Sequence, residues 1–208
     1  FRQEKIACEQ LLIEEHRKSG FPHTIVRPSH TYGNGWLPTS FGSKDYTVAS
    51  RMLEGKEIIV HGDGTSLWTL THTEDFAFGF CGLLGNPRAI GDTFHITSDE
   101  ALSWDRIHLT IADALGVKAR IVHVPSEIIA RFSPERGPSL MGDKAYSAVF
   151  CNDKIRSAVP DYKPRILFYQ GVRRSLAWYD AHPEAKAPVE STNAEIDALL
   201  EKWHAMLG

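Results

Sequence analysis

Cysteine is scarce in this chain and its spacing is uninformative. The 208 residues contain three cysteines, Cys8, Cys81 and Cys151, which stand far apart and include no Cys-x-x-Cys pair. An odd number of widely spaced cysteines argues against a disulfide-stapled secreted fold and favours free, buried thiols in a reducing compartment. We therefore expect a cytoplasmic protein.

Long apolar runs, strong net charge and metal-ligand spacings are missing as well. No run approaches the ~18 apolar residues that a membrane span needs, and no signal peptide opens the chain, so no membrane partner is predicted. A net charge of -3 without long charged runs argues against nucleic acid as a partner. The ten histidines show no His-x-x-x-His spacing, so no metal is predicted. A serine hydrolase is disfavoured because no Gly-x-Ser-x-Gly is present.

What the chain does contain is an alternation of short apolar runs and amphipathic segments. Strands are expected at 24–27, 58–60, 67–71, 93–97 and 119–124. Helices are expected at 1–19, 46–53, 73–84, 103–115, 152–159, 168–179 and 192–207, with another starting at 126 and a long loop over 132–146. This alternation predicts an α/β protein with a parallel or mixed sheet.

The stretch from Thr24 to Gly35 is the most informative one. A β-branched run ends at Pro28, which lacks the N–H that a strand ladder needs, and a polar loop is expected at 29–34. In open α/β sheets ligands bind beyond the carboxyl ends of the strands. The side chains expected to face a ligand are those of Arg27, Ser29, His30 and Tyr32. The alternative is an ordinary strand-to-helix loop with a surface histidine.

Two other features have plainer interpretations. Gly79, Gly82 and Gly85 have the spacing of a dinucleotide-binding turn, but they fall within or at the end of an expected helix and no strand leads into them. Close packing of that helix is the predicted reason for the glycines. Asp75 is predicted to interact with the dipole of the same helix, because it lies in its first turn.

Three segments carry a family resemblance when they are taken together. They are Phe1-Arg-Gln-Glu-Lys5, Arg27-Pro-Ser-His-Thr-Tyr-Gly33, and Gly62-Asp-Gly64 continuing to Thr73-Glu-Asp75-Phe-Ala77. In this order they resemble the extended short-chain dehydrogenases/reductases, the NAD-dependent epimerase/dehydratase group that acts mainly on nucleotide sugars. The resemblance covers most of the chain up to about Pro125.

The resemblance implies part of a Rossmann-like, mostly parallel sheet with a smaller, mainly helical substrate-binding lobe. Residues 1–35 would end the dinucleotide-binding domain, and residues 36–208 would form the substrate-binding lobe with elements that partly return to the sheet. Because residue 1 is Phe and already lies in an expected helix, we expect a piece of a longer protein. A missing amino-terminal segment or a partner chain, with a homodimer as one form, would complete the cleft.

The resemblance also implies residue roles. Lys5 matches the family lysine that holds the nicotinamide ribose and assists catalysis, and Phe1 occupies the position of the family's catalytic Tyr. Contacts to NAD or NADP are expected from Lys5, Pro28, Ser29 and His30. Contacts to a small-molecule substrate are expected from Arg27, His30, Tyr32, Trp68 and His72.

Several departures from the family pattern leave two hypotheses open. A phenyl ring at residue 1 carries no exchangeable proton, Trp68 stands near where many members place a diphosphate-binding Arg, and the glycine-rich pyrophosphate turn is not in this sequence. The first hypothesis is the carboxy-terminal portion of an NAD(P)-dependent epimerase, dehydratase or reductase. These 208 residues alone would then bind NAD weakly or not at all and would not turn over substrate. The second is a non-catalytic relative that serves as a binding module for RNA or protein.

Overall fold

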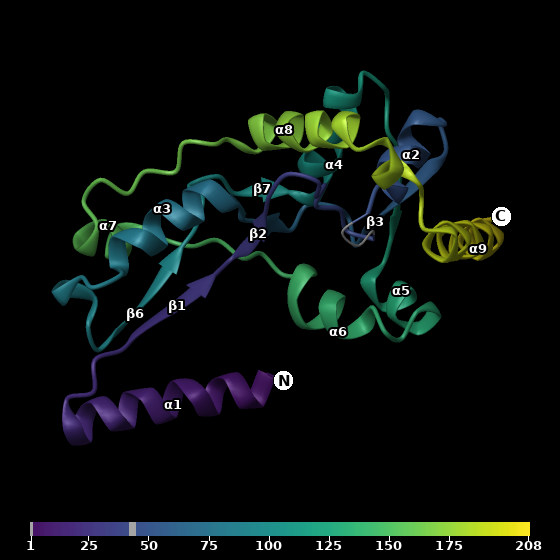
Figure 1. Ribbon diagram of the computed structural model, residues 1–208. Helices are drawn as coiled ribbons and strands as arrows, with labels where there is room; N and C mark the ends of the chain where they lie inside the picture. Colours follow the sequence, from purple (N-terminus) through teal and green to yellow (C-terminus); the bar gives the residue numbers. More distant parts are fainter. Residues whose placement is uncertain (1, 42–44) are drawn as a thin grey trace.

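The computed structural model describes residues 2–41 and 45–208 (Figure 1). Its strands are β1 (Thr24–Pro28), β2 (His30–Tyr32), β3 (Glu57–His61), β4 (Leu67–Trp68), β5 (Leu70–His72), β6 (Asp92–Ile96), β7 (Leu102–Ser103) and β8 (Arg120–Val124). The α-helices are α1 (Arg2–Ser19), α2 (Thr47–Leu53), α3 (Thr73–Leu83), α4 (Trp104–Leu115), α5 (Ser126–Phe132), α6 (Gly137–Ser139), α7 (Asp153–Ala158), α8 (Phe168–Ala181) and α9 (Glu190–Leu207). A π-helical segment, η2, spans Leu140–Lys144.

The strands of the described ranges associate in pairs. β1 with β6, β2 with β5, and β3 with β8 are parallel, and β4 with β7 is antiparallel. Each parallel pair joins strands that are distant in the sequence, with Thr24 opposite Asp92 and Glu57 opposite Arg120. The prediction of an α/β fold with mostly parallel strands is confirmed.

Local signals set several helix ends as expected. The Ser103 hydroxyl accepts a hydrogen bond from the Arg106 amide at 3.2 Å and begins α4. Gly116 ends the same helix in the left-handed conformation, with a φ of 72°. Two of the three spaced glycines mark close packing, as predicted, because a Cβ on Gly79 would lie 2.7 Å from an Ile96 methyl and one on Gly82 would lie 2.6 Å from a Val159 methyl. For Gly85 the prediction is wrong, because a Cβ there would meet nothing within 4 Å; this glycine follows α3 with a φ of 66°.

Four other expectations are wrong. Residues 30–32 form β2 instead of a loop, because they pair with β5, and such pairing leaves no trace in the local sequence. Part of the expected 132–146 loop is helical, in α6 and η2. The last helix starts at Glu190, without a side-chain cap. The free cysteines Cys8, Cys81 and Cys151 are exposed, not buried.

Three buried clusters hold these elements together. The largest packs β3, α4 and α8 around Ile58, Trp104 and Val172, all fully buried. A second joins α5 to α9 through Ile129 and Leu199. The third is formed by β6 with α3 and α7. Burial of a large apolar side chain stabilises a fold by about 1.5–3 kcal/mol, so each cluster is a substantial anchor.

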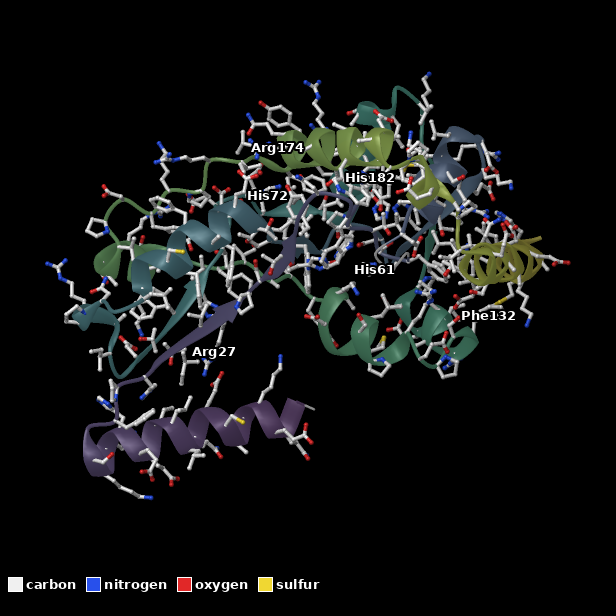
Figure 2. The ribbon with its side chains drawn as sticks, viewed as in Figure 1. Arg27, His61, His72, Phe132, Arg174 and His182 are labelled. Atoms are coloured by element: carbon white, nitrogen blue, oxygen red, sulfur yellow. The ribbon has the colours of Figure 1, made fainter. Side chains whose placement is uncertain are left out.

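Helix α1 has a different character from the other long helices. In Figure 1 it runs beside β1 and apart from the rest of the chain. Its apolar residues Ile6 and Leu11 are more than half exposed, at 56% and 59%. The side chain of Arg27 points from β1 toward this helix (Figure 2) and forms a bidentate ion pair with Glu9, in which Arg27 Nε donates to Glu9 Oε1 at 3.0 Å. No helix within residues 2–41 and 45–208 is both long and apolar enough to cross a membrane.

Candidate functional site

The chain changes its strand partner at Ser29. The strand before it, β1, pairs with β6, whereas the strand after it, β2, pairs with β5. Since all of these pairs are parallel, the carboxyl ends of β1 and β6 lie together at this point. A change of strand order at the carboxyl ends is where open α/β sheets bind ligands. The topology therefore places a candidate site at Ser29.

A hydroxyl network fixes the backbone there. Ser29 Oγ lies 2.8 Å from Thr71 Oγ1, which also accepts a hydrogen bond from the Ser98 amide at 2.8 Å. Thr71 belongs to β5, and Ser98 follows β6 closely. Thr71 is fully buried, so its bond to the Ser98 amide forms away from solvent, whereas the bond to Ser29 is partly buried. Buried, satisfied hydroxyls hold the ends of β1, β5 and β6 in one geometry.

A cavity of about 280 Å³ opens at this point. It is lined by Pro28, Ser29 and His30 from the strand switch, by Trp68 and Thr69 from β4 and the residue after it, and by Asp143, Ala148 and Phe150 from a distant segment. The volume is near the lower end of the range typical of small-molecule sites. The three contributing segments come from well-separated parts of the sequence.

The wall of the cavity that Asp143, Ala148 and Phe150 form is attached to β4 and to the residue after it by backbone and side-chain hydrogen bonds. The Ala148 amide donates to the Leu67 carbonyl at 2.8 Å, and Thr69 Oγ1 donates to the Ala148 carbonyl at 3.1 Å. On the other side, the ring of Phe150 packs 4.8 Å from that of His95, in β6. The wall is therefore fixed at both edges, and Phe150 is held beside the strand switch.

The electrostatics of the cavity come from a few groups. The carboxylate of Asp143 forms no ion pair or hydrogen bond with another side chain of the described residues. The neighbouring Lys144 ammonium donates to Ser139 Oγ at 2.6 Å instead, and burial lowers the pKa of this lysine. His30 packs against Trp36 with ring centroids 5.0 Å apart. Asp143 is thus the carboxylate that the wall presents, and it lies close enough to the Lys144 ammonium for the two to interact electrostatically.

Of the residues expected from the sequence, the structure brings four together. Pro28, Ser29, His30 and Trp68 line the same cavity. Thr69, Asp143, Ala148 and Phe150 line it too and were missed. For the last three the only sequence signal is the Pro- and Gly-rich stretch before them, which does not reveal that residue 148 lies beside residue 68.

Two of the expected residues come from the first five of the sequence. Phe1, at the position of the family Tyr, lies outside the described residues. Lys5 is exposed and is not among the residues that line the cavity. It lies one turn before Glu9, so both side chains share a helix face, and Glu9 is held to β1 by Arg27. Lys5 is thus on the face of α1 that is turned toward β1. The ion pair with Arg27 lowers the pKa of Glu9.

Tyr32 and His72 are buried beneath the site instead of lining it. Their rings pack edge to face at 5.4 Å. His72 begins α3, its Nδ1 accepting from the Glu74 amide at 3.3 Å, and burial lowers its pKa. Tyr32 is 1% exposed and its hydroxyl has no hydrogen-bond partner among the described residues. Burial accordingly raises the pKa of Tyr32.

Tyr32→Phe tests whether this tyrosine is a core residue. A buried hydroxyl without a partner costs about 1–3 kcal/mol, so removing it should raise the free energy of unfolding by about 1 kcal/mol. Urea denaturation monitored by tryptophan fluorescence measures the change. Lower stability, or a loss of ligand binding at the cavity, would instead show that the hydroxyl makes a useful contact.

The chain is similar in sequence to several known proteins. Residues 1–97 match the model of the NAD dependent epimerase/dehydratase family. A dTDP-glucose 4,6-dehydratase of Actinoplanes sp. is 27% identical over 179 residues, which cover 86% of this chain and 50% of the relative. A chloroplast stem-loop binding protein of 41 kDa from Arabidopsis thaliana is 28% identical over 120 residues, which cover 57% of this chain and 30% of the relative.

Solved structures agree in fold. The UDP-glucuronic acid 4-epimerase of Bacillus cereus in complex with NAD has a TM-score of 0.65 at 20% identity, over 88% of this chain and 51% of that one. The chain spans half or less of the length of the curated relatives described above.

Proposed function

We propose that this chain, whose residues 1–97 match the model of the NAD dependent epimerase/dehydratase family, supplies the substrate-binding part of an NAD(P)-dependent epimerase, dehydratase or reductase. The substrate of the whole protein would be sugar-like or a nucleotide sugar. The observation that carries the proposal is the cavity at the strand switch, where Ser29 and His30 face Trp68 and Phe150. Domain boundaries near residue 35 and a cytoplasmic location remain parts of this proposal.

The residues at the strand switch fit the nicotinamide end of a dinucleotide. Pro28 and Ser29 lie at the carboxyl end of a parallel strand, where this class of fold holds the cofactor. Lys5 lies on the β1-facing side of α1 and would bind the ribose hydroxyls. A bound nicotinamide cofactor supplies the hydride acceptor or donor. This chain's own residues then orient the sugar, with His30 and Trp68 as its first contacts.

Residue 1 is the point at which the proposal departs from its family. The family uses a Tyr there to remove a proton from a substrate hydroxyl, with a nearby lysine lowering the pKa of that Tyr. Phe1 cannot exchange a proton. In this protein Lys5 would therefore bind the cofactor without activating its neighbour, and proton transfer would need another group.

Binding of NADH by the intact protein tests the proposal. Lys5→Ala is expected to weaken binding tenfold or more, about 1.4 kcal/mol, as followed by nicotinamide fluorescence. Lys18→Ala is the matched control, since Lys18 lies on the same helix and pairs only weakly with Glu14 and Glu15 on the surface. Equal binding by both variants, or no binding by the parent protein, would contradict the proposal.

A second candidate function is a non-catalytic binding module. Phe1 at the Tyr position favours it, and the name of the chloroplast relative describes binding to a stem-loop. Under this alternative the protein slows the migration of a stem-loop RNA in a gel-shift assay and does not bind NADH. The net charge of -3 makes RNA the weaker of the two ligands.

A further inference from the structure

The solvent side of α8 and the segments beside it form a distinct surface. The helix buries Phe168, Val172 and Tyr179, so Tyr169 and Arg173 lie on its outer side, and Figure 1 shows α8 along the outside of the molecule. Neighbouring segments add further exposed side chains to the same surface. We call this surface the α8 face, and it comprises Phe78, Arg106, Lys163, Arg165, Tyr169 and Arg173.

Two hollows border the α8 face. One, of about 260 Å³, lies between α3 and the segment that leads into α8, and the other, of about 190 Å³, lies between α4 and α8. Cations line both hollows, with Lys163, Arg165 and Arg174 in the first and Arg106 and Arg173 in the second. No described residue that lines either hollow also lines the cavity at the strand switch. The α8 face is therefore separate from the candidate site.

The carboxylates of the first hollow already have partners. Glu74 pairs with Arg174 at 3.0 Å, and Asp75 accepts hydrogen bonds from the two backbone amides at 165 and 166, both at 2.9 Å. The Lys163 ammonium and the Arg165 guanidinium form no ion pair among the described residues. Two cations of this hollow are therefore available to bind an anion.

The cations of the second hollow are unpaired as well. Within the described residues the side chains of Arg106 and Arg173 form no ion pair, and Asp113 is the one carboxylate among the residues that line this hollow. Ion pairs neutralise several arginines elsewhere in the chain, namely Arg27, Arg51, Arg120, Arg136 and Arg156. Unpaired positive charge gathered on one face of a chain with a net charge of -3 attracts an anionic partner.

Exposed aromatic rings accompany these cations. Phe78 is 44% exposed and Tyr169 is 47% exposed. The guanidinium carbon of Arg165 lies 5.5 Å from the centre of the Phe78 ring, and that of Arg173 lies 5.9 Å from the centre of the Tyr169 ring. Each contact is within the range of a cation–π interaction, which holds the guanidinium beside the ring. Arginine together with exposed aromatic rings is the composition of protein–protein interfaces, so the rings point to a polypeptide and not to a small anion.

We propose that the α8 face binds an acidic polypeptide segment of a partner protein, whose carboxylates pair with the four unpaired cations and whose apolar side chains cover the two exposed rings. Carboxylates form charge-assisted hydrogen bonds with guanidinium groups, often two at once. A nucleic acid fits less well, because its closely spaced phosphates would also meet the carboxylates of Glu74 and Asp113. The inference does not depend on the proposed function, because the α8 face lies outside the cavity at the strand switch.

Fluorescence anisotropy with the intact protein and a labelled peptide tests this inference. The peptide has about twelve residues, half glutamate and half leucine, and two companion peptides carry glutamine in place of glutamate or serine in place of leucine. The acidic leucine peptide is expected to bind at least tenfold more tightly than the glutamine peptide and at least threefold more tightly than the serine peptide. Added salt should reduce the first preference, because it screens exposed charges. Absent binding, or equal binding of the acidic and glutamine peptides, would overturn the inference.

The double variant Arg165→Glu/Arg173→Glu should weaken binding of the acidic leucine peptide at least tenfold, and its fold should persist because both side chains are exposed. Arg88→Glu is the matched control, since Arg88 is an exposed arginine outside the α8 face with no ion pair among the described residues, and it should change the affinity by twofold or less. Asp113→Asn should tighten binding about twofold, because it removes an opposing charge.

Three results would contradict the assignment of this surface to an acidic polypeptide. The first is a double variant that binds the peptide as tightly as the parent does. The second is polyuridine that binds the parent more tightly than the peptide does. The third is a parent protein that self-associates in sedimentation while the double variant stays monomeric, because a second copy of the chain would then be the partner.

Discussion

The protein is expected to lose about 3 kcal/mol of stability between pH 6.5 and pH 4 through a single histidine. His108 is fully buried, and burial lowers its pKa to about 4. An unfolded chain binds a proton at this residue near pH 6.5, so between the two values the unfolded state holds more protons. The contribution is therefore complete above pH 6.5 and declines as the pH falls toward 4.

Hydrogen bonds explain why His108 stays neutral. The Ser40 amide donates to its Nε2 at 3.2 Å, so this nitrogen must act as an acceptor. Nδ1 then carries the proton and donates to the Trp104 carbonyl at 2.7 Å. A second proton on Nε2 would face the Ser40 N–H. His61 and His123 lie near enough to oppose a further positive charge, and Asp105 favours it weakly.

Urea denaturation from pH 4.5 to 7.5 measures this effect. His108→Phe fills the space without a titrating group. The slope of its free energy of unfolding against pH should therefore correspond to about one proton fewer taken up on unfolding than in the parent. His204→Gln serves as the control, because His204 is exposed and contacts Glu57 at the surface. The assignment is wrong if the Phe variant keeps the parent's pH dependence.

Asp75→Ala is expected to lower the free energy of unfolding by about 3 kcal/mol. The carboxylate of Asp75 is nearly buried and accepts two backbone hydrogen bonds, from the amides of Arg165 and Ile166, both at 2.9 Å. Alanine leaves both amides without an acceptor, and each buried unpaired group costs about 1–3 kcal/mol. The 163–167 segment that leads into α8 would lose its attachment to α3.

Two companion variants make this measurement specific. Asp75→Asn retains one acceptor oxygen and should lie between the parent and the alanine variant. Glu74→Gln removes the adjacent carboxylate, which pairs with Arg174 at 3.0 Å on the surface, and should change stability by less than about 1 kcal/mol. Amide hydrogen exchange at 165 and 166 should accelerate in Asp75→Ala only. Equal stability of the Asp75→Ala and Glu74→Gln variants would contradict the assignment.

The predictions that succeeded rest on local chemistry. Pro28 ends β1, Ser103 begins α4 and Gly116 ends it, because each signal acts through its own backbone or the next turn. The glycines of α3 were correctly attributed to packing for a similar reason, since a phosphate-binding turn needs a strand directly before it.

The features that were missed depend on contacts between distant residues. β2 exists because His30 pairs with Leu70, and the cavity wall exists because Trp68 lies beside Ala148. Neither contact can be recognised from the local sequence of the segments involved. Asp75 was assigned to a helix dipole, whereas its main partners lie ninety residues away. The sequence could therefore locate the near side of the site but not the opposite one.

The pairing of distant strands affects how this protein folds during its synthesis. β1 can pair with β6 only after the chain from residue 92 has been synthesised, and β3 can pair with β8 only after the chain from residue 120 has been synthesised. Closing such long intervals slows folding, and nascent chains lengthen by only about 5–20 residues per second. During synthesis the early strands are therefore exposed for several seconds. Chaperone engagement should be strongest in that interval and should fall once β8, which ends at Val124, has left the ribosome.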